Sequence, residues 1–291
     1  MLHALLSLFM LANIQWVAPS VTTSTFDPVN LLQAPVIPVK KNEAVAPLIK
    51  AKAALLIDMD SGTALYEKNS HDPLPIASLT KIMTAVIILE AHKPDEIVTI
   101  RNNYDTIEGT RAYFRKNEKI TVKDMLKAML VNSANDAAMI LAEFHSGSAE
   151  QFAVDMNKKA RTLNLLNTRF KNPVGFDEDG HYSSAYDLAL LTKYALKKDL
   201  FRKIVKQPSI DFTDINGNNP HRLFSTNELL GSYLGIEGVK TGTTDAAGPC
   251  LINLARNPRN NHEVLAVLLN SPDRFQENKS MIDWAFTNYS W

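Results

Sequence analysis

Two parts of the chain have the hydrophobic pattern of β-strands, one near residue 55 and one after residue 235. Near residue 55, two short apolar runs are separated by the turn Asp60-Ser61-Gly62, which predicts a β-hairpin. After residue 235, strong apolar runs alternate with turns rich in Gly, Asn and Pro, so further strands are expected there. The predicted strands cover residues 53–59, 63–67, 235–240, 249–255 and 264–269.

The residues between these two parts follow helical spacing instead. From residue 77 to about 91 the apolar positions would cover nearly the whole circumference of a helix, which predicts a buried central helix. Further helices are expected over 122–130 with Thr121 as cap, then from Ser133 to 142, and over 149–163, 185–197 and 275–289. Strands at both ends with helices inserted predict an α+β fold. In this fold an antiparallel sheet is flanked by helices and carries an inserted helical subdomain at roughly 102–205.

The N-terminal segment is expected to lie outside the folded domain. Residues 4–18 form a mostly apolar run, shorter than the roughly 20 residues of a membrane span and interrupted by Asn13 and Gln15. The run suits a secretory signal with a cleavage site at Ala18-Pro19-Ser20, although only His3 supplies a polar residue before it. We therefore expect a signal peptide or weak N-terminal anchor over 1–20, a Pro-containing linker over 21–48, and a catalytic domain over 49–291.

Composition and charge exclude several classes of function. The chain of 291 residues has 31 Lys+Arg and 31 Asp+Glu, so no net field attracts nucleic acid. The seven histidines are scattered, and Glu143-Phe144-His145 is the nearest approach to a metal-binding fragment, so neither a metal nor another cofactor is expected. The single cysteine, Cys250, cannot form an internal disulfide and is expected to be a buried small hydrophobe.

Three short motifs carry the candidate chemistry: Ser78-Leu79-Thr80-Lys81, Ser133-Ala134-Asn135 and Lys240-Thr241-Gly242. Each is common enough to arise by chance, and Ser225-Thr226-Asn227 is a second Ser-x-Asn. The prediction of a shared function rests on their order and on their expected positions, on a helix, at a helix start and at a strand end.

A spacing of three residues places Ser78 and Lys81 on one face of a helix. A serine hydroxyl is a poor nucleophile until a base removes its proton, and a buried lysine beside a second cation can be that base. The alternative is that Ser78 only caps the helix.

The other two motifs have similar pairs of interpretations. Ser133 could relay a proton to a leaving amine and Asn135 could hold a substrate amide, or Ser133 could be a helix cap. Lys240 and Thr241 offer a cation and a hydroxyl to a substrate carboxylate, and Gly242 lets a substrate backbone approach closely. A phosphate-binding loop is excluded because Val239 separates Gly238 from Lys240.

With these motifs in place, the sequence strongly resembles the low-molecular-mass penicillin-binding proteins. These are the serine-type D-alanyl-D-alanine carboxypeptidases of peptidase family S11. The resemblance covers nearly all of 49–291 and implies a β-lactamase/transpeptidase-like fold. It rests on residues 74–85, Ser133-Ala134-Asn135-Asp136-Ala137-Ala138, Asn172-Pro173-Val174-Gly175, and Gly238-Val239-Lys240-Thr241-Gly242-Thr243-Thr244 with Ala247-Gly248.

The resemblance implies a role for each matching residue. Ser78 would attack the penultimate D-Ala carbonyl after Lys81 takes its proton, and Ser133 and Lys240 would pass the proton to the departing D-Ala. The substrate-binding residues would be Asn135 for the peptide backbone, and Thr241 with Lys240 for the terminal carboxylate. Gly242 and Thr243 would lie beside the oxyanion, which the backbone N–H groups of Ser78 and Thr243 would bind, and Arg274 would support carboxylate recognition.

The expected partners are peptidoglycan stem peptides ending in D-Ala-D-Ala, and β-lactam antibiotics as covalent inhibitors. The expected location is the periplasm or the outer face of the cytoplasmic membrane. The sequence stops after the predicted final helix, where many relatives continue, so any membrane tether is expected only at an uncleaved N-terminus.

Three alternatives remain. A DD-endopeptidase that cuts cross-links would use the same residues. A class A β-lactamase would need a loop glutamate in a Glu-x-x-Leu-Asn setting, which Asp177, Glu178 and Asp179 lack. A non-catalytic binder of penicillin or peptidoglycan would not need Ser78 and Lys81 intact.

Overall fold

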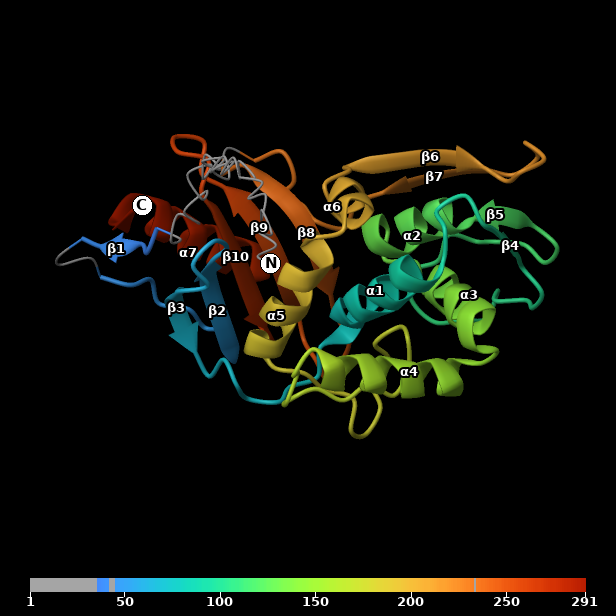
Figure 1. Ribbon diagram of the computed structural model, residues 1–291, viewed down its shortest axis with the longest axis horizontal. Coiled ribbons are helices and arrows are strands. Elements are labelled where there is room, and N and C mark those ends of the chain that lie inside the picture. Colours follow the sequence, from blue (N-terminus) through green and yellow to red (C-terminus); the bar gives the residue numbers. More distant parts are fainter. Residues whose placement is uncertain (1–35, 42–44, 233) are drawn as a thin grey trace, which may run out of the picture. The chain divides into compact units, whose positions relative to one another are not determined.

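A five-stranded antiparallel sheet with the order β3-β2-β10-β9-β8 forms the centre of the fold (Figure 1). The structure is a computed structural model and describes residues 36–41, 45–232 and 234–291. The strands are β2 (Ala53–Asp58), β3 (Ala64–Lys68), β8 (Ile236–Gly242), β9 (Cys250–Arg256) and β10 (Glu263–Leu269). The predicted hairpin and the predicted C-terminal strands are thereby confirmed, each within a few residues of its expected ends.

The two faces of this sheet are covered by different helices, because side chains alternate between the faces of a strand. On β2, Leu55 and Ile57 pack in one hydrophobic cluster with helix α5 (Ala185–Leu196), while Ala54 and Leu56 pack in a second cluster with helix α7 (Arg274–Asn288). Both faces are therefore buried. This explains why β2, β9 and β10 have continuous apolar runs and not an alternating pattern, whereas the edge strand β3 buries only one of its residues.

The remaining helices form a second group beside the sheet (Figure 1). Helix α1 (Lys81–Ala91) lies among them and packs against α2, α3, α4 and α5. Its residues Lys81 to Ile88 are all buried, as the apolar pattern predicts. The other members are α2 (Val122–Val131), α3 (Asn135–Ser146), α4 (Ala149–Thr162) and α6 (Asp199–Val205). Together with the sheet they make an α+β fold, the predicted class.

The expected helical subdomain, 102–205, does not coincide with the helical group in the structure. Helix α5 lies inside that range but packs on strands β2 and β10 of the sheet, whereas α1 lies outside it and packs with the helical group. The chain therefore enters the helical group at α1 and returns to the sheet at α5, before α6.

Some short elements have no clear signal in the sequence. They are β4 (Ile97–Thr99) paired with β5 (Lys119–Thr121), β6 (Ser209–Thr213) paired with β7 (Pro220–Phe224), and β1 (Val39–Lys40) paired with β11 (Tyr289–Ser290). In the hairpin β6–β7 each strand buries a single residue, Ile210 and His221, so there is no hydrophobic alternation to detect.

The N-terminal part of the chain is described only from residue 36 onwards. The described residues belong to one compact unit, Pro35–Trp291, and the expected signal segment over 1–20 lies outside the described residues. Within the expected linker of 21–48, Val39–Lys40 pairs with the C-terminal strand β11, so this part of the segment contacts the domain. Among the described residues, no helix is long and apolar enough to cross a membrane.

Candidate active site

Ser78 lies in a single 3₁₀ turn, Ala77–Thr80, that leads directly into α1. Ala77 has a φ of 48°, a left-handed conformation that non-glycine residues rarely adopt. The helix N-cap is Thr80 and no side chain caps it, so the interpretation of Ser78 as a helix cap is wrong. The serine is instead presented by a turn with an unusual backbone, a feature that clusters at functional sites.

Lys81 lies one turn away and contacts Ser78 directly. Its Nζ is 2.7 Å from Ser78 Oγ, 2.8 Å from Asn135 Oδ1 and 3.0 Å from the Val174 carbonyl oxygen. The side chain is 0% exposed. Burial and then the charge of Lys240 hold the pKa of Lys81 well below its ordinary value, against the opposing effect of Asp136. A lysine in this state can accept the proton of Ser78 at neutral pH.

Ser133 and Asn135 lie where the chain passes from α2 into α3. The predicted helix start at Ser133 is wrong, because Ser133 has a φ of 66° and α3 begins at Asn135 with Ala134 as N-cap. Asn135 binds on both sides of its amide, accepting from Lys81 and donating through Nδ2 to the Glu108 carbonyl at 2.6 Å. No hydrogen bond joins Ser133 to Lys81 or Lys240 among the described residues.

Lys240 and Thr241 lie near the end of strand β8 and still pair with β9. Thr241 therefore belongs to the strand and not to the turn that follows it. Lys240 is 1% exposed and donates from Nζ to the Thr241 carbonyl at 2.9 Å. Burial first, and then the Arg274 charge, lower the pKa of Lys240 to about 7. The Thr241 hydroxyl shares a hydrogen bond of 2.5 Å with Thr226, which belongs to the second Ser-x-Asn copy.

Gly242 keeps β8 close to the nucleophile. A Cβ on this residue would lie 2.9 Å from the Ser78 backbone nitrogen and 3.1 Å from the Ala77 Cβ. Any side chain would therefore push β8 away from the serine N–H. Arg274, at the start of α7, donates to the Gly242 carbonyl at 2.9 Å and to Thr243 Oγ1 at 2.6 Å, so it fixes the end of the strand.

These residues surround a cleft of about 380 Å³. Its lining includes Ser78, Ser133, Asn135 and Thr243, together with residues 108–110 and 174–177. The lining does not include Lys81, Lys240, Thr241, Gly242 or Arg274. The structure thus brings the three motifs, which are 162 residues apart from Ser78 to Lys240 in sequence, to one site.

Two residues that support the site were not assigned a role from the sequence. Asp136, 1% exposed, accepts backbone N–H groups of Ala112 at 3.0 Å and Tyr113 at 2.9 Å and so holds the loop that continues from the cleft wall. An acidic residue in the first turn of α3 is the sequence signal that could have indicated it. His181, 5% exposed, bonds Thr80 Oγ1 at 2.8 Å, and its isolated position in the sequence gives no signal.

Two of the acidic residues weighed for a β-lactamase mechanism are engaged by other groups, although Asp177 lines the cleft. Asp177 accepts from Thr244 Oγ1 at 2.6 Å and from the Ala246 N–H at 2.9 Å, and Glu178 accepts from Asn172 Nδ2 at 3.2 Å. Among the described residues, no group of His, Cys, Asp and Glu could hold a metal ion. Cys250 is buried, as predicted, and burial raises the pKa of its thiol to about 11.

The sequence is similar to those of known D-alanyl-D-alanine carboxypeptidases. The D-alanyl-D-alanine carboxypeptidase family model matches residues 40–273. D-alanyl-D-alanine carboxypeptidase DacF of Bacillus subtilis is 40% identical over 248 residues, which are 82% of this chain and 63% of the relative. A D-alanyl-D-alanine endopeptidase of Escherichia coli is 32% identical over 233 residues, 78% of this chain and 74% of that protein. The chain thus spans less than two thirds of the length of DacF.

Solved structures with the same fold include a DD-transpeptidase and a penicillin-binding protein. The Streptomyces K15 DD-transpeptidase superposes with a TM-score of 0.78 at 29% identity, covering 84% of this chain and 99% of the other. Penicillin-binding protein D2 of Listeria monocytogenes, in its ampicillin-bound form, superposes with a TM-score of 0.72 at 32% identity, covering 83% of this chain and 100% of the other. From its motifs, its fold and the family match over most of its length, the chain belongs to the D-alanyl-D-alanine carboxypeptidase family, peptidase family S11.

Proposed function

We propose that the chain is a serine D-Ala-D-Ala carboxypeptidase that removes the terminal D-alanine from peptidoglycan stem peptides, with Ser78 as the acylated nucleophile. The observation that carries this proposal is the contact of 2.7 Å between Ser78 and a fully buried Lys81 whose pKa is lowered well below its ordinary value. This contact supplies a base for the serine within proton-transfer distance.

Acylation begins when Lys81 takes the proton of the Ser78 hydroxyl. The serine oxygen then bonds to the penultimate D-Ala carbonyl carbon, and the carbonyl oxygen becomes an oxyanion. The backbone N–H groups of Ser78 and Thr243 would bind that oxyanion, and Gly242 leaves the space for it. Collapse of the tetrahedral intermediate breaks the C–N bond, and the departing amine receives the proton through Ser133 and Lys240.

The terminal carboxylate is recognised by the end of β8. Lys240 supplies positive charge and Thr241 a hydroxyl, while Arg274 keeps Gly242 and Thr243 in position. Asn135 holds the peptide backbone on the acyl side, and its position is fixed by Lys81 and the Glu108 carbonyl. Water then attacks the ester, which restores Ser78 and releases the shortened peptide.

A β-lactam would acylate Ser78 in the same way and stay bound, because its leaving amine remains attached to the acyl group. Binding of ampicillin by the related penicillin-binding protein D2 supports this expectation. We also propose that the enzyme is exported to the periplasm or the outer face of the cytoplasmic membrane, where such a substrate lies, through a signal peptide or weak N-terminal anchor over residues 1–20.

The test is labelling with a fluorescent penicillin, read by gel and intact mass. Wild type and Ser225→Ala are expected to form a stable adduct, since Ser225 belongs to the other Ser-x-Asn copy, whereas Ser78→Ala forms none. Wild type then releases D-Ala from a pentapeptide. An adduct that persists in Ser78→Ala overturns the assignment, and rapid drug turnover without an adduct indicates a β-lactamase. Failure with both drug and peptide indicates a non-catalytic binder.

A further inference from the structure

The second Ser-x-Asn copy, Ser225-Thr226-Asn227, has no role in the mechanism described above, but it contacts the end of β8. The Thr226 Oγ1 atom is 2.5 Å from Oγ1 of Thr241, the hydroxyl proposed to bind the terminal carboxylate. Thr241 is 4% exposed and Thr226 is partly buried. Within the described part of the chain, neither hydroxyl has another hydrogen-bond partner. The two hydroxyls therefore form an isolated pair at the place where the carboxylate is expected.

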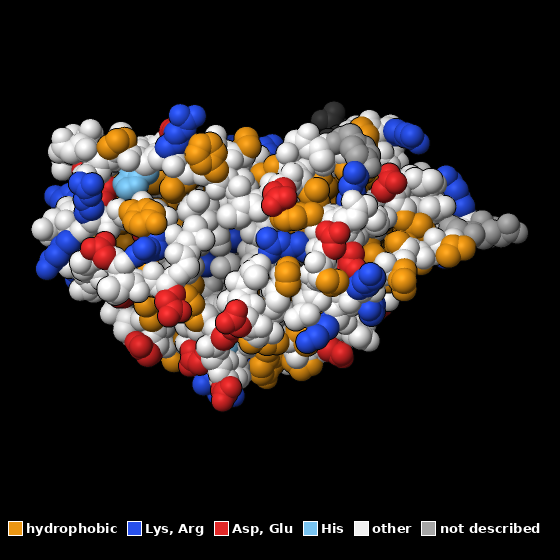
Figure 2. All heavy atoms as spheres, turned by 180° about the vertical axis from the view of Figure 1, so that it is seen from behind, with side chains coloured by type: hydrophobic (Ala, Val, Ile, Leu, Met, Phe, Trp, Pro, Cys, Tyr) orange, Lys and Arg blue, Asp and Glu red, His pale blue; other side chains and the backbone are white. Residues whose placement is uncertain are grey.

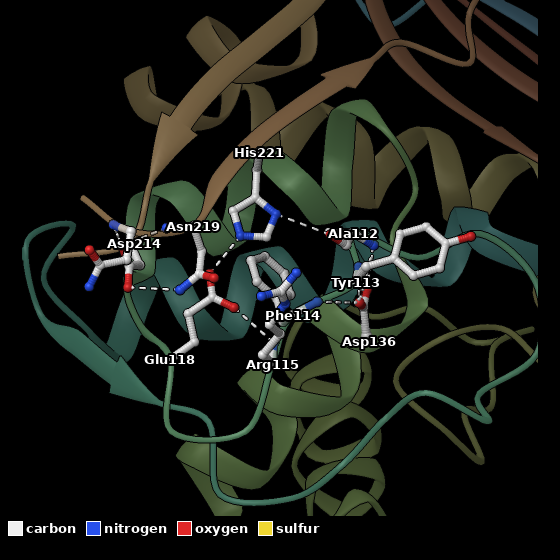
Figure 3. A network of polar contacts seen from close by, with 10 residues as sticks. Ala112, Tyr113, Phe114, Arg115, Glu118, Asp136, Asp214, Asn219 and His221 are labelled. Atoms are coloured by element: carbon white, nitrogen blue, oxygen red, sulfur yellow. Dashed lines mark hydrogen bonds and ion pairs between the residues drawn. The ribbon is translucent and has the colours of Figure 1, made fainter. Parts of the chain in front are cut away.

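The segment that carries Thr226 is fixed on its N-terminal side by contacts with the helical group. It follows strand β7, and His221 of this strand is tied to the segment 111–118 (Figure 3). The carbonyl of the last residue of β7 accepts from Asn132 Nδ2 at 3.3 Å, and the Thr226 N–H donates to the Val131 carbonyl at 3.3 Å. Thr226 thus lies in a segment that connects the end of α2 with strand β8.

On its C-terminal side the segment is fixed by an asparagine row, formed by the buried side chains of Asn227, Asn253 and Asn278. Asn227 Nδ2 donates to Asn253 Oδ1 at 2.7 Å, and Asn253 Nδ2 donates to Asn278 Oδ1 at 2.9 Å. Asn253 belongs to β9 and Asn278 to α7, and both are 0% exposed. Asn278 Nδ2 has no hydrogen-bond partner among the described residues, so the row is not optimised for stability. Its effect is to fix Asn227, and with it the adjacent Thr226.

Net charge gives no general attraction for the terminal carboxylate. The chain has 31 basic and 31 acidic residues. On the face shown in Figure 2, Lys and Arg side chains are mixed with Asp and Glu side chains and form no broad positive area. Lys240, with a pKa of about 7, is only partly charged at neutral pH. Recognition of the carboxylate therefore depends on individual groups, and the direction of the Thr241 hydroxyl becomes important.

The hydrogen bond between the two hydroxyls decides what Thr241 can offer a ligand. Each hydroxyl has one proton. If Thr241 donates to Thr226, its proton is used, and a carboxylate would meet an oxygen lone pair. If Thr226 donates to Thr241, the Thr241 proton can point at the carboxylate. Because a carboxylate only accepts, its binding requires the second arrangement, in which each hydrogen bond strengthens the next.

We propose that Thr226 is a positioning residue for recognition of the terminal carboxylate. Its hydroxyl donates to Thr241 and so directs the Thr241 proton to the carboxylate, while Asn227 holds Thr226 in place. The inference rests on the proposed function, because it concerns the ligand of the same site.

The test compares two substitutions of one residue. Thr226→Val keeps the shape and removes the hydroxyl, whereas Thr226→Ser keeps the hydroxyl. With a pentapeptide ending in D-Ala-D-Ala, Thr226→Val is expected to raise KM about tenfold with little change in kcat, because the bond is made in the bound substrate and in the transition state alike. Thr226→Ser should stay within about twofold of wild type. Thr213→Val removes an exposed hydroxyl from β6 and is the matched control, with no change expected.

A neutral ligand separates positioning from a merely structural role. Benzylpenicillin has a free carboxylate and its methyl ester has none, and hydrogen bonds to a charged acceptor are the stronger ones. Thr226→Val is expected to lower the rate constant for acylation of Ser78 by the penicillin about tenfold, and by the ester less than about twofold. Equal losses with both ligands would mean a general defect of the site and would overturn the proposal.

Asn227→Ala tests the asparagine row. It is expected to raise KM for the pentapeptide, and its combination with Thr226→Val should raise KM no further than Thr226→Val alone, because Asn227 acts through Thr226. A further rise in the combination would contradict this role of Asn227.

The same measurements distinguish failure of the inference from failure of the proposed function. If wild type forms the penicillin adduct and releases D-Ala, but Thr226→Val has the KM of wild type, the role of Thr226 is overturned and the proposed function stands. If wild type neither forms the adduct nor releases D-Ala, both fail.

Discussion

The His181 Nε2 atom lies 2.8 Å from Thr80 Oγ1, so a buried imidazole supports the turn that carries Ser78. The Thr80 hydroxyl donates to the Ala77 carbonyl at 2.8 Å. The Lys171 N–H donates to Nδ1 of His181 at 3.2 Å, so Nδ1 is the acceptor and the proton of the neutral ring lies on Nε2. The ring thus donates to Thr80, and the left-handed conformation of Ala77 is held by a chain of hydrogen bonds that needs a neutral histidine.

This contact predicts a specific loss of stability in mild acid. Burial lowers the pKa of His181 to about 4 from an ordinary value of 6.5. As pH falls through 6.5, His181 is protonated in the unfolded chain, whereas in the folded chain it is protonated only near pH 4. The contribution of His181 to the free energy of unfolding is fully present above pH 6.5. It falls by about 3 kcal/mol as the pH drops from 6.5 to 4.

Urea unfolding at pH values from 4 to 7.5 measures this slope. His181→Gln keeps a donor for Thr80 but does not titrate, so its unfolding free energy should vary less with pH than that of wild type. Equal slopes in the two proteins would remove His181 as the cause.

The arrangement around Ser78 shows what helical spacing can and cannot predict. The Ser78–Lys81 contact follows from a separation of three residues, which joins them on one helical face. The pattern could not show that Ser78 lies in a 3₁₀ turn, nor that His181, 101 residues later than Thr80, supports it. Such contacts depend on how loops fold back on a helix, and a single polar residue in a loop leaves no periodic signal.

The loop 172–176 gives the second prediction. Asn172 Oδ1 accepts the Gly175 N–H at 2.7 Å, which brings the Val174 carbonyl to Lys81. Gly175 has a φ of +97°, and a Cβ there would lie 1.9 Å from the Ala77 carbonyl oxygen. Gly175→Ala must therefore displace the loop or the nucleophile turn. We expect the rate of penicillin acylation to fall about a hundredfold, as a misplacement of about 1 Å can do.

Gly217→Ala is the matched control for this substitution. Gly217 also has a positive φ, 74°, but nothing lies within 4 Å of its Cβ position. It should lose about 1 kcal/mol of stability from backbone strain and retain normal acylation. If Gly175→Ala also acylates normally, close approach of this loop is not needed for the nucleophile.

The third prediction concerns the charge beside Lys240. With a pKa of about 7, Lys240 loses its proton just above neutrality, and carboxylate recognition weakens as pH rises. Arg274→Gln removes a cation that lowers this pKa but keeps a donor for the Gly242 carbonyl. The pH at which kcat/KM declines on the alkaline side should therefore move to a higher value, even if the maximum of kcat/KM also changes.

The measurement is the pH dependence of acylation by a chromogenic β-lactam. Arg259→Gln, an exposed arginine in the turn between β9 and β10, is the control and should leave the pH of the alkaline decline unchanged. If the alkaline decline of the acylation rate in Arg274→Gln occurs at the same pH as in wild type, or at a lower pH, Arg274 does not set the protonation of Lys240.

The sheet and the hairpin β6–β7 differ in how far the sequence could predict them. Strands β2, β9 and β10 are almost completely buried, so their long apolar runs indicate strands directly. Each strand of the hairpin buries a single residue, so no hydrophobic pattern indicates it. Ser133 was expected to start a helix because serine is a common cap, but its positive φ places it outside the helix and beside the cleft.

The last prediction concerns the buried pair that joins β7 to the segment 111–118. His221 and Glu118 are 2.6 Å apart, with side chains only 7% and 1% exposed. Because the Ala112 carbonyl can only accept, the Nδ1 of His221 donates to it. Removing one partner leaves a buried polar group uncompensated. We therefore expect His221→Phe, which suits the flanking rings of Phe114 and Phe212, to lose about 3–5 kcal/mol of unfolding free energy.

A double-mutant cycle with Glu118→Leu tests the pair. The double variant should lose clearly less than the sum of the single losses, because the orphaned carboxylate is then gone. Arg222→Ala with Asp211→Ala removes the exposed pair on the same hairpin and should show a coupling of less than about 1 kcal/mol. Additive losses at His221 and Glu118 would mean that each stabilises the fold separately. The segment 111–118 would then not depend on β7 for its position.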